Sequence, residues 1–399
     1  MKVKNLVLMA LVATMGLVSC SKDEHEDGVK TDTMPKSVTI KLPNIQKTVK
    51  SRATGDAMKG GSQVALENFK VFFVDAAGNL QTVPQYENQD QQVYFSKTDS
   101  EWAEIGENGK DITYHFLPAA TSKVVVVGNI GDVEYSTIAT RVDHIPNDNG
   151  SGHPTYPLYG EDELEEKKLD GSEIHDNVYT ANVTLEPRVS RFEIYGFQYT
   201  QEGDVPKYTS VKLQKIALNN YYTQSDFVSK LPVEDTKVFE TIDHTEVWGW
   251  IEDRSAPWAD ELNLELAVGG KKFVDGTDIT DPAEDGEDAA GIITYGLAHV
   301  TDAAKNPELL LALRGVNSNS EVPLYLRGQF TNASAFTSGK IYRVLYSFTD
   351  GDFDEPERCV ELNVDVADWT VVPVSPEILI IIKGCGMAGV SRLPPLFSP

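Results

Sequence analysis

The sequence contains little of what catalytic, nucleic-acid-binding or disulfide-stabilised proteins require. Only 3 of its 399 residues are cysteine, too few for a disulfide framework. The 7 histidines are scattered, and G-x-S-x-G, H-E-x-x-H and P-loop motifs are absent, so the sequence predicts no enzymatic activity, no metal site and no cofactor. Basic residues number 35 against 61 acidic ones, a formal net charge of -26. Because phosphate backbones are bound by basic patches, this balance argues against nucleic acid as a partner.

The first apolar run is too short for a permanent membrane span. It covers the 13 residues Leu6–Val18, follows two lysines, and leads into the sequence Leu-Val-Ser-Cys that ends at Cys20. A spanning helix needs about 20 apolar residues. The sequence therefore predicts a lipoprotein signal peptide over residues 1–20, with Cys20 as the lipidated residue. Only Cys359 and Cys385 then remain, and whether they pair is left open.

Short alternating runs and turn residues fill the rest of the chain. Glycine and proline number 30 and 20, aromatic residues make up 9%, and helix-period stretches are scarce, which favours an all-β fold. The stretch from His144 to Gly171 is expected to be irregular, and the pattern resets near Pro187. We expect two β-sandwich domains, residues 53–188 and 189–358. The candidate strands are Phe69–Val74, Ile112–Phe116, Val124–Val127 and Tyr179–Leu185, followed by Ser190–Phe197, Ser210–Leu218, Val247–Ile251, Leu262–Val268, Pro323–Phe330 and Ile341–Phe348.

A short strand precedes the first of these domains. Val38, Ile40 and Leu42 alternate with polar residues, and a basic, glycine-bearing segment follows over residues 46–61. Such a segment is typical of protease-accessible backbone, and it contains Arg52. If the strand completes the first sandwich, a cut after Arg52 would release it and leave an apolar groove with unpaired edges.

The C-terminal region carries the longest alternating pattern. Its phase slips by one residue after Asp368, which predicts one long strand with a bulge. This strand either closes the second sandwich within its own chain or fills the groove of another copy by strand addition. Burying four aliphatic side chains contributes about 6–12 kcal/mol gross, enough for a head-to-tail polymer. The apolar positions are Val360, Leu362, Val364, Val366, Trp369 and Val371.

Three stretches carry a resemblance to a known family. They are Arg188–Ile194, Gly339–Val344 and Val364–Val372. Together with the signal peptide and the two series of strands, they resemble FimA-type major fimbrillins, the stalk subunits of Bacteroidales type V pili. The resemblance implies two tandem transthyretin-like β-sandwich domains with a cleavable N-terminal strand and an extended C-terminal donor strand.

The resemblance also implies a maturation route. The precursor would be held at the cell outer membrane by its lipid, and an arginine-specific protease would cut between Arg52 and Ala53, removing the pro-segment 21–52. Polymerisation by donor-strand exchange, with residues 359–378 as donor, would join copies of the chain and other pilus subunits into a cell-surface fimbrium for adhesion and biofilm formation. Residues 379–399, which begin within an apolar run, depart from the family pattern. They lengthen the donor strand, form an aggregation-prone tail, or result from a change of reading frame or stop codon.

Alternatives remain open from the sequence. Trp248 and Trp250 share one face of a candidate strand and Trp258 lies close by, so a surface-exposed glycan-binding lipoprotein competes with the pilus subunit, although buried aromatic residues are the more frequent case. Anchor and tip subunits of the same pilus class are further alternatives, and the adhesion ligand is not indicated. The acidic stretches 275–288 and 350–355 lack the glycine and glutamate of an EF-hand loop, so solvated charge is favoured over calcium binding.

Overall fold

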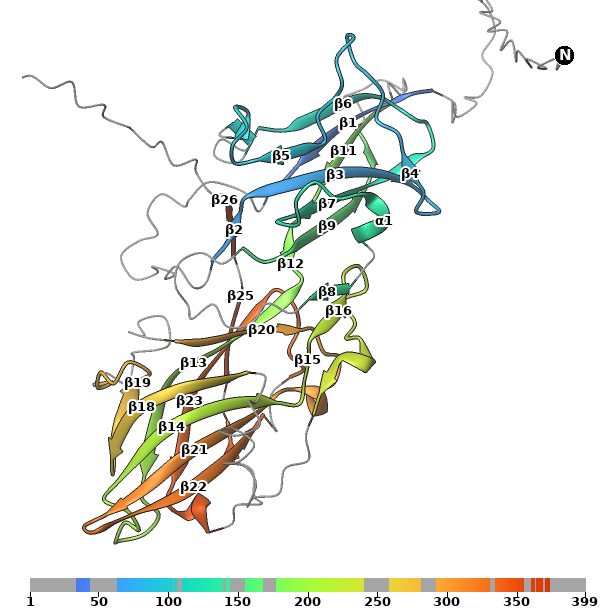
Figure 1. Ribbon diagram of the computed structural model, residues 1–399. Helices are drawn as coiled ribbons and strands as arrows, with labels where there is room; N and C mark the ends of the chain where they lie inside the picture. Colours follow the sequence, from blue (N-terminus) through green and yellow to red (C-terminus); the bar gives the residue numbers. More distant parts are fainter. Residues whose placement is uncertain are drawn as a thin grey trace, which may run out of the picture.

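The computed structural model describes residues 34–43, 63–102, 104–105, 110–138, 141–143, 155–167, 177–239, 258–280, 292–330, 334–354, 360–362, 364–368 and 370–373. The prediction of an all-β fold is confirmed (Figure 1). Helical structure within these ranges includes the one-turn helix α1 (Tyr135–Ile138) and 3₁₀ turns at Glu234–Thr236, Ala303–Lys305 and Gly351–Phe353. None of the described helices has the length and apolar character that a membrane crossing requires.

The N-terminal half of the chain forms two sheets, which we call the N-terminal sheet pair. One sheet has four strands in the order β10 (Glu165–Glu166), β11 (Val178–Asn182), β1 (Lys36–Lys41), β6 (Ile112–Leu117). The other has the order β12 (Glu186–Pro187), β9 (Leu158–Glu163), β7 (Thr121–Gly128), β3 (Asn68–Asp75), β4 (Leu80–Gln81), with β5 (Tyr94–Ser96) also on β3. Their buried side chains form one apolar core that includes Ile40 of β1, Tyr114 of β6, Phe73 of β3 and Val126 of β7.

The C-terminal half forms a second pair, the C-terminal sheet pair. Its first sheet has the order β19 (Lys271–Phe273), β13 (Val189–Thr200), β23 (Lys340–Thr349), β25 (Val364–Asp368), with β20 (Ile293–Ala298) also on β13. Its second has the order β18 (Ala259–Ala267), β14 (Ser210–Asn219), β21 (Glu308–Asn317), β22 (Ser320–Gln329), β24 (Val360–Glu361). Aromatic and aliphatic side chains of both sheets fill the space between them, among them Phe197, Leu213, Leu311 and Tyr346.

Three two-stranded pairings complete the architecture. They are β15 (Tyr221–Tyr222) with β17 (Lys237–Val238), β16 (Gln224–Asp226) with β8 (Arg141–Asp143), and β2 (Gln63–Leu66) with β26 (Thr370–Pro373). The last two join the halves of the chain, and Figure 1 shows β8 and β16 between the two sheet pairs and β2 and β26 beside the N-terminal pair. The strand β12 ends at Pro187 and β13 begins at Val189, next to the boundary expected at residue 188. The division into two transthyretin-like domains stays a prediction.

Two expectations about individual strands need correction. Residues 158–163, expected to be irregular, form β9, which pairs with β7 along its whole length. A Cβ added at Gly160 would lie 2.3 Å from the Thr184 carbonyl oxygen, so only glycine fits this close approach. The strand β21, which was not expected, is central in its sheet. The candidate strand Val247–Ile251 lies outside the described residues.

Candidate functional site

The strand β1 is a central strand of the N-terminal sheet pair. It pairs in parallel with β11, from Ser37↔Val178 to Lys41↔Asn182, and antiparallel with β6, from Lys36↔Leu117 to Ile40↔Ile112. Its backbone therefore satisfies hydrogen-bonding groups on both neighbours. Removing β1 would leave two facing strands with unpaired edges.

Side chains of β1 are divided between the core and the surface. Val38 and Ile40 are 0% and 1% exposed, and Leu42 packs against the same core. On the other face, Thr39 Oγ1 lies 3.0 Å from Thr113 Oγ1, and Lys41 is exposed. The sequence alternation thus identified the buried face correctly.

The structure does not describe the residues proposed for lipidation and cutting. Cys20, Arg52 and Ala53 are outside the described residues, as is the whole segment 44–62 that connects β1 to β2. Their roles stay predictions. What the structure adds is that β1 is covalently continuous with the rest of the fold only through this segment.

The C-terminal stretch forms three short strands instead of one long strand. β24 pairs in parallel with β22, β25 pairs antiparallel with β23, and β26 pairs in parallel with β2. These partners belong to three different sheets, and the phase slip predicted after Asp368 coincides with the change of partner from β23 to β2. Trp369 lies outside the described residues, and for Val364, Val366 and Val371 the backbone alone is described.

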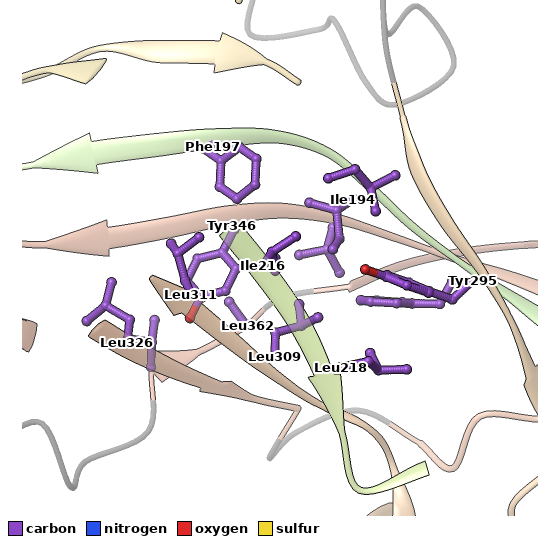
Figure 2. Close-up of a cluster of buried hydrophobic side chains, with 14 of the residues drawn as sticks. Ile194, Phe197, Ile216, Leu218, Tyr295, Leu309, Leu311, Leu326, Tyr346 and Leu362 are labelled. Atoms are coloured by element: carbon purple, nitrogen blue, oxygen red, sulfur yellow. The ribbon is translucent and has the colours of Figure 1, made fainter. Parts of the chain in front are cut away.

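The first part of this stretch belongs to the core of its own chain. Val360 and Leu362 are 7% and 3% exposed. Leu362 lies near Leu309 and Leu311 within the C-terminal sheet pair (Figure 2). A Cβ added at Gly328 would be 2.6 Å from Leu362 Cδ1, so the glycine makes room for this side chain. Val360 and Leu362 therefore stabilise the subunit that carries them, as core side chains do.

The last part of the stretch covers β2. The four pairs run from Gln63↔Thr370 to Leu66↔Pro373, and Val64, Ala65 and Leu66 are all at most 2% exposed. Asn129 Nδ2 also donates to the Ala65 carbonyl oxygen at 2.6 Å. In this state β26 therefore pairs with a buried strand, β2, whose side chains pack in the core of the N-terminal sheet pair.

A buried ionic group connects the two long strands of the C-terminal sheet pair, and sequence analysis did not identify it. Arg343 Nε donates to Glu193 Oε2 at 2.8 Å, and Arg191 Nε lies 2.5 Å from Glu193 Oε1. Glu193 and Arg343 are register partners in the parallel pair β13–β23. Arg191, Glu193 and Arg343 lie in two of the stretches that carry the family resemblance. Removing Glu193 would leave two buried guanidinium groups without their counterion, so its carboxylate constrains this sheet.

Arg188 connects the two halves of the chain. Its guanidinium lies 4.1 Å from the Tyr159 ring centroid and 5.9 Å from that of Phe227, which come from different halves of the chain. Burial lowers the pKa of Arg188 to about 10, so the group stays cationic at neutral pH. Stacking on both rings fits a charged guanidinium and fixes the halves at this point.

Trp258 and Asp350, which lie in stretches considered above for glycan and calcium binding, are held within the fold. Trp258 stacks on Tyr221 with ring centroids 3.7 Å apart and packs against the C-terminal core, while Trp248 and Trp250 lie outside the described residues. Asp350 is 1% exposed and accepts hydrogen bonds from the backbone N–H groups of Glu202 and Lys207, so the expectation of solvated charge is wrong there. Across the described ranges, no group of three or more His, Cys, Asp or Glu residues is placed to hold a metal ion.

Comparisons with known proteins give structural matches alone. No family model and no curated protein matches the sequence. A protein from Bacteroides eggerthii, described as a candidate cell adhesion protein, is 16% identical with a TM-score of 0.43, covering 86% of this chain and 98% of that one. A protein of the same description from Parabacteroides distasonis is 12% identical with a TM-score of 0.45, covering 85% and 98%. A fimbrial anchor protein from Porphyromonas gingivalis is 12% identical with a TM-score of 0.29, covering 78% and 90%. All three TM-scores are below 0.5.

Proposed function

We propose that the chain is a structural subunit of a cell-surface fibre, exported as a lipoprotein, cut after Arg52 and polymerised by strand exchange. The observation that carries this proposal is the position of β1, an N-terminal strand inserted between β11 and β6. A cut anywhere in residues 44–62 separates this strand from everything that follows it. The product would be a sandwich with one strand missing from the middle of a sheet.

The gap left by β1 would bind a replacement strongly. Burying Val38 and Ile40 contributes about 1.5–3 kcal/mol each, and the edges of β6 and β11 each offer a row of hydrogen-bonding groups. The entropy of ordering a new strand reduces this gain. A segment from a second copy that supplies two aliphatic side chains in alternation would satisfy both the core and the edges.

Two features limit which C-terminal residues can serve as the donor strand. Val360 and Leu362 are held in the core of their own chain, so their transfer would destabilise the subunit that donates them. Pro373 lacks a backbone N–H and is disfavoured within a central strand. The stretch between them contains β25, which among the described strands pairs with β23 alone. We infer that β25 is the donor strand.

The alternation of apolar and polar residues in β25 then fixes its register in the groove left by β1. Placing Val366 at the position of Val38 would bring Asp368 to the buried position of Ile40, which would bury a charge without a partner. Placing Val364 at Val38 and Val366 at Ile40 gives an aliphatic side chain at both buried positions. Asp368 then falls at the position of Leu42, near the end of the strand.

Changing the cleavage residue tests the maturation step. We expect Arg52→Ala and Arg52→Lys to leave a full-length, lipidated precursor on the membrane, because an arginine-specific protease accepts neither residue. The matched control is Lys50→Ala, which removes a nearby positive charge and should leave maturation unchanged. The measurement is N-terminal sequencing of surface-extracted protein, with a start at Ala53 expected for the wild type and the control.

The same experiment separates the alternatives. Normal-length surface fibres from Arg52→Ala would contradict the cleavage step. A wild-type protein that keeps its lipidated N-terminus and stays monomeric would favour a glycan-binding lipoprotein. A lipidated protein that caps fibres would favour an anchor subunit, and a cut protein that adds only at fibre ends would favour a tip subunit.

A further inference from the structure

The strand β6 carries an exposed aromatic residue in a strained backbone conformation. Phe116 has a φ of 59° and is 56% exposed. The pairing of β6 with β1 shifts register here, so that His115 and Phe116 together oppose Ser37. Glycine is the usual residue in the left-handed position of such a bulge, and a bulky side chain there is rare. Strain of this kind is typical of functional positions.

A hairpin places the Tyr86 ring beside two residues of β6, His115 and Phe116. Tyr86 and Gln89 exchange backbone hydrogen bonds of 2.9 Å in both directions, around two residues with positive φ, which is the geometry of a tight type I′ turn. The Tyr86 ring stacks on His115 with centroids 4.3 Å apart and lies 5.8 Å from the Phe116 centroid. The three rings therefore form one surface cluster, which we call the aromatic platform.

The platform is fixed in place by Gln91. The Gln91 side chain donates to the His115 carbonyl oxygen at 2.8 Å and accepts from the His115 N–H at 2.7 Å. It also donates to the Pro84 carbonyl oxygen at 2.7 Å, which ties the hairpin to β6. Because these bonds hold the His115 backbone and the hairpin together, the rings are organised before any ligand arrives, which lowers the entropy cost of binding.

The chemistry around the rings indicates the ligand. Gln85 and Asp90 form an exposed side-chain pair at 2.9 Å in the same hairpin and provide donors and acceptors for hydroxyl groups. Glu87 and Asp90, together with a net charge of -26, oppose anionic ligands. The rings pack on one another instead of enclosing a box, so a flat ligand with C–H faces fits better than a compact cation. A sugar ring has such faces and hydroxyl groups at its edge.

We propose that the aromatic platform of Tyr86, His115 and Phe116 binds a neutral oligosaccharide by stacking. The three rings come from β6 and the hairpin, and β1 contributes Ser37, whose Oγ lies 3.3 Å from His115 Nδ1. The platform is therefore complete in the uncut chain, where it can be tested without strand exchange.

The test uses the uncut, full chain with maltohexaose, cellohexaose and mannohexaose as probes. We expect at least one probe to bind the wild type, detected by saturation-transfer NMR and titration calorimetry. The variant Phe116→Gly should weaken that binding at least tenfold. Because glycine suits the backbone at this bulge, its melting temperature should be unchanged or up to about 4 °C higher. The control Phe239→Ser, which removes another exposed ring, should bind normally.

Three outcomes would overturn the proposal. These are no binding of any probe at millimolar concentration, wild-type affinity in Phe116→Gly, or a fall of its melting temperature by more than about 4 °C, which would make Phe116 a packing residue. If no probe binds while Phe116→Gly blocks fibre formation, the platform contacts an incoming strand and the saccharide site is refuted. None of these results bears on cutting at Arg52.

Discussion

Replacing Ile40 by aspartate should unfold the N-terminal sheet pair of the uncut chain. Ile40 is 1% exposed in a central strand, so the variant would lose an aliphatic side chain from the core and bury a carboxylate without a partner. The expected cost is on the order of 4 kcal/mol, a large part of the stability of a domain. Lys41→Asp, an exposed change one residue away, should melt within about 2 °C of the wild type. Calorimetry of both variants measures the difference.

The same substitution tests the groove after cutting. Chain cut at Arg52 and freed of its N-terminal fragment should bind a synthetic peptide of residues 34–43. The peptide with Ile40→Asp should bind at least 100-fold more weakly, a loss of about 2.7 kcal/mol. Equal affinity of the two peptides would show that the gap does not select a strand by its buried face, and the proposal of strand exchange would fail.

Local features of β1 could be predicted from the sequence, but its partners could not. The alternation of Val38, Ile40 and Leu42 with polar residues predicted the strand and its buried face, because this signal is contained in adjacent residues. The neighbours β6 and β11 are distant in sequence, and strand pairing leaves no comparable mark in a single chain. The insertion of β1 into the middle of a sheet therefore needed the structure.

In the C-terminal stretch, the alternating pattern predicted strands but not their number or their partners. Alternating apolar residues are equally compatible with one long strand and with short strands in different sheets. Leu362 packs in the core of its own chain because Gly328, which is distant in sequence, leaves space for its side chain. The strand β9 was missed because acidic residues fill its second half, while Leu158, Tyr159 and Gly160 are the ones buried in the sheet. The strain at Phe116 is a backbone property that no residue pattern predicted.

Under the proposed route, the described strand pairs would oppose polymerisation before the cut. The groove is filled by β1, and the proposed donor β25 is paired with β23 in its own chain. Downstream of it, β26 satisfies the buried strand β2. Donation would therefore break two sets of strand pairs within one chain, and the new pairs in a neighbouring copy have to offset this cost.

Shortening the chain from its C-terminus should separate donor residues from core residues. A chain that ends at Asn363 keeps Val360 and Leu362 but loses β25 and β26, so we expect a folded, cut monomer that forms no polymer. A chain that ends at Cys359 also loses two buried aliphatic side chains, which costs about 2–5 kcal/mol for each residue in a core, and its C-terminal sheet pair should melt well below that of the chain ending at Asn363.

A third end point decides which segment is donated. A chain that ends at Pro373 keeps β25 and β26 and lacks only residues 374–399, so polymer ladders on a gel should persist if Val364 and Val366 enter the groove. Within the full chain, Val366→Asp should then abolish the ladders, because its carboxylate would take the buried position of Ile40, whereas Asp365→Asn should leave them intact at the outward position of Thr39. Loss of polymer from the chain ending at Pro373 would place the donor in the apolar run of residues 378–382 instead. Polymer from the chain ending at Asn363 would refute C-terminal donation altogether.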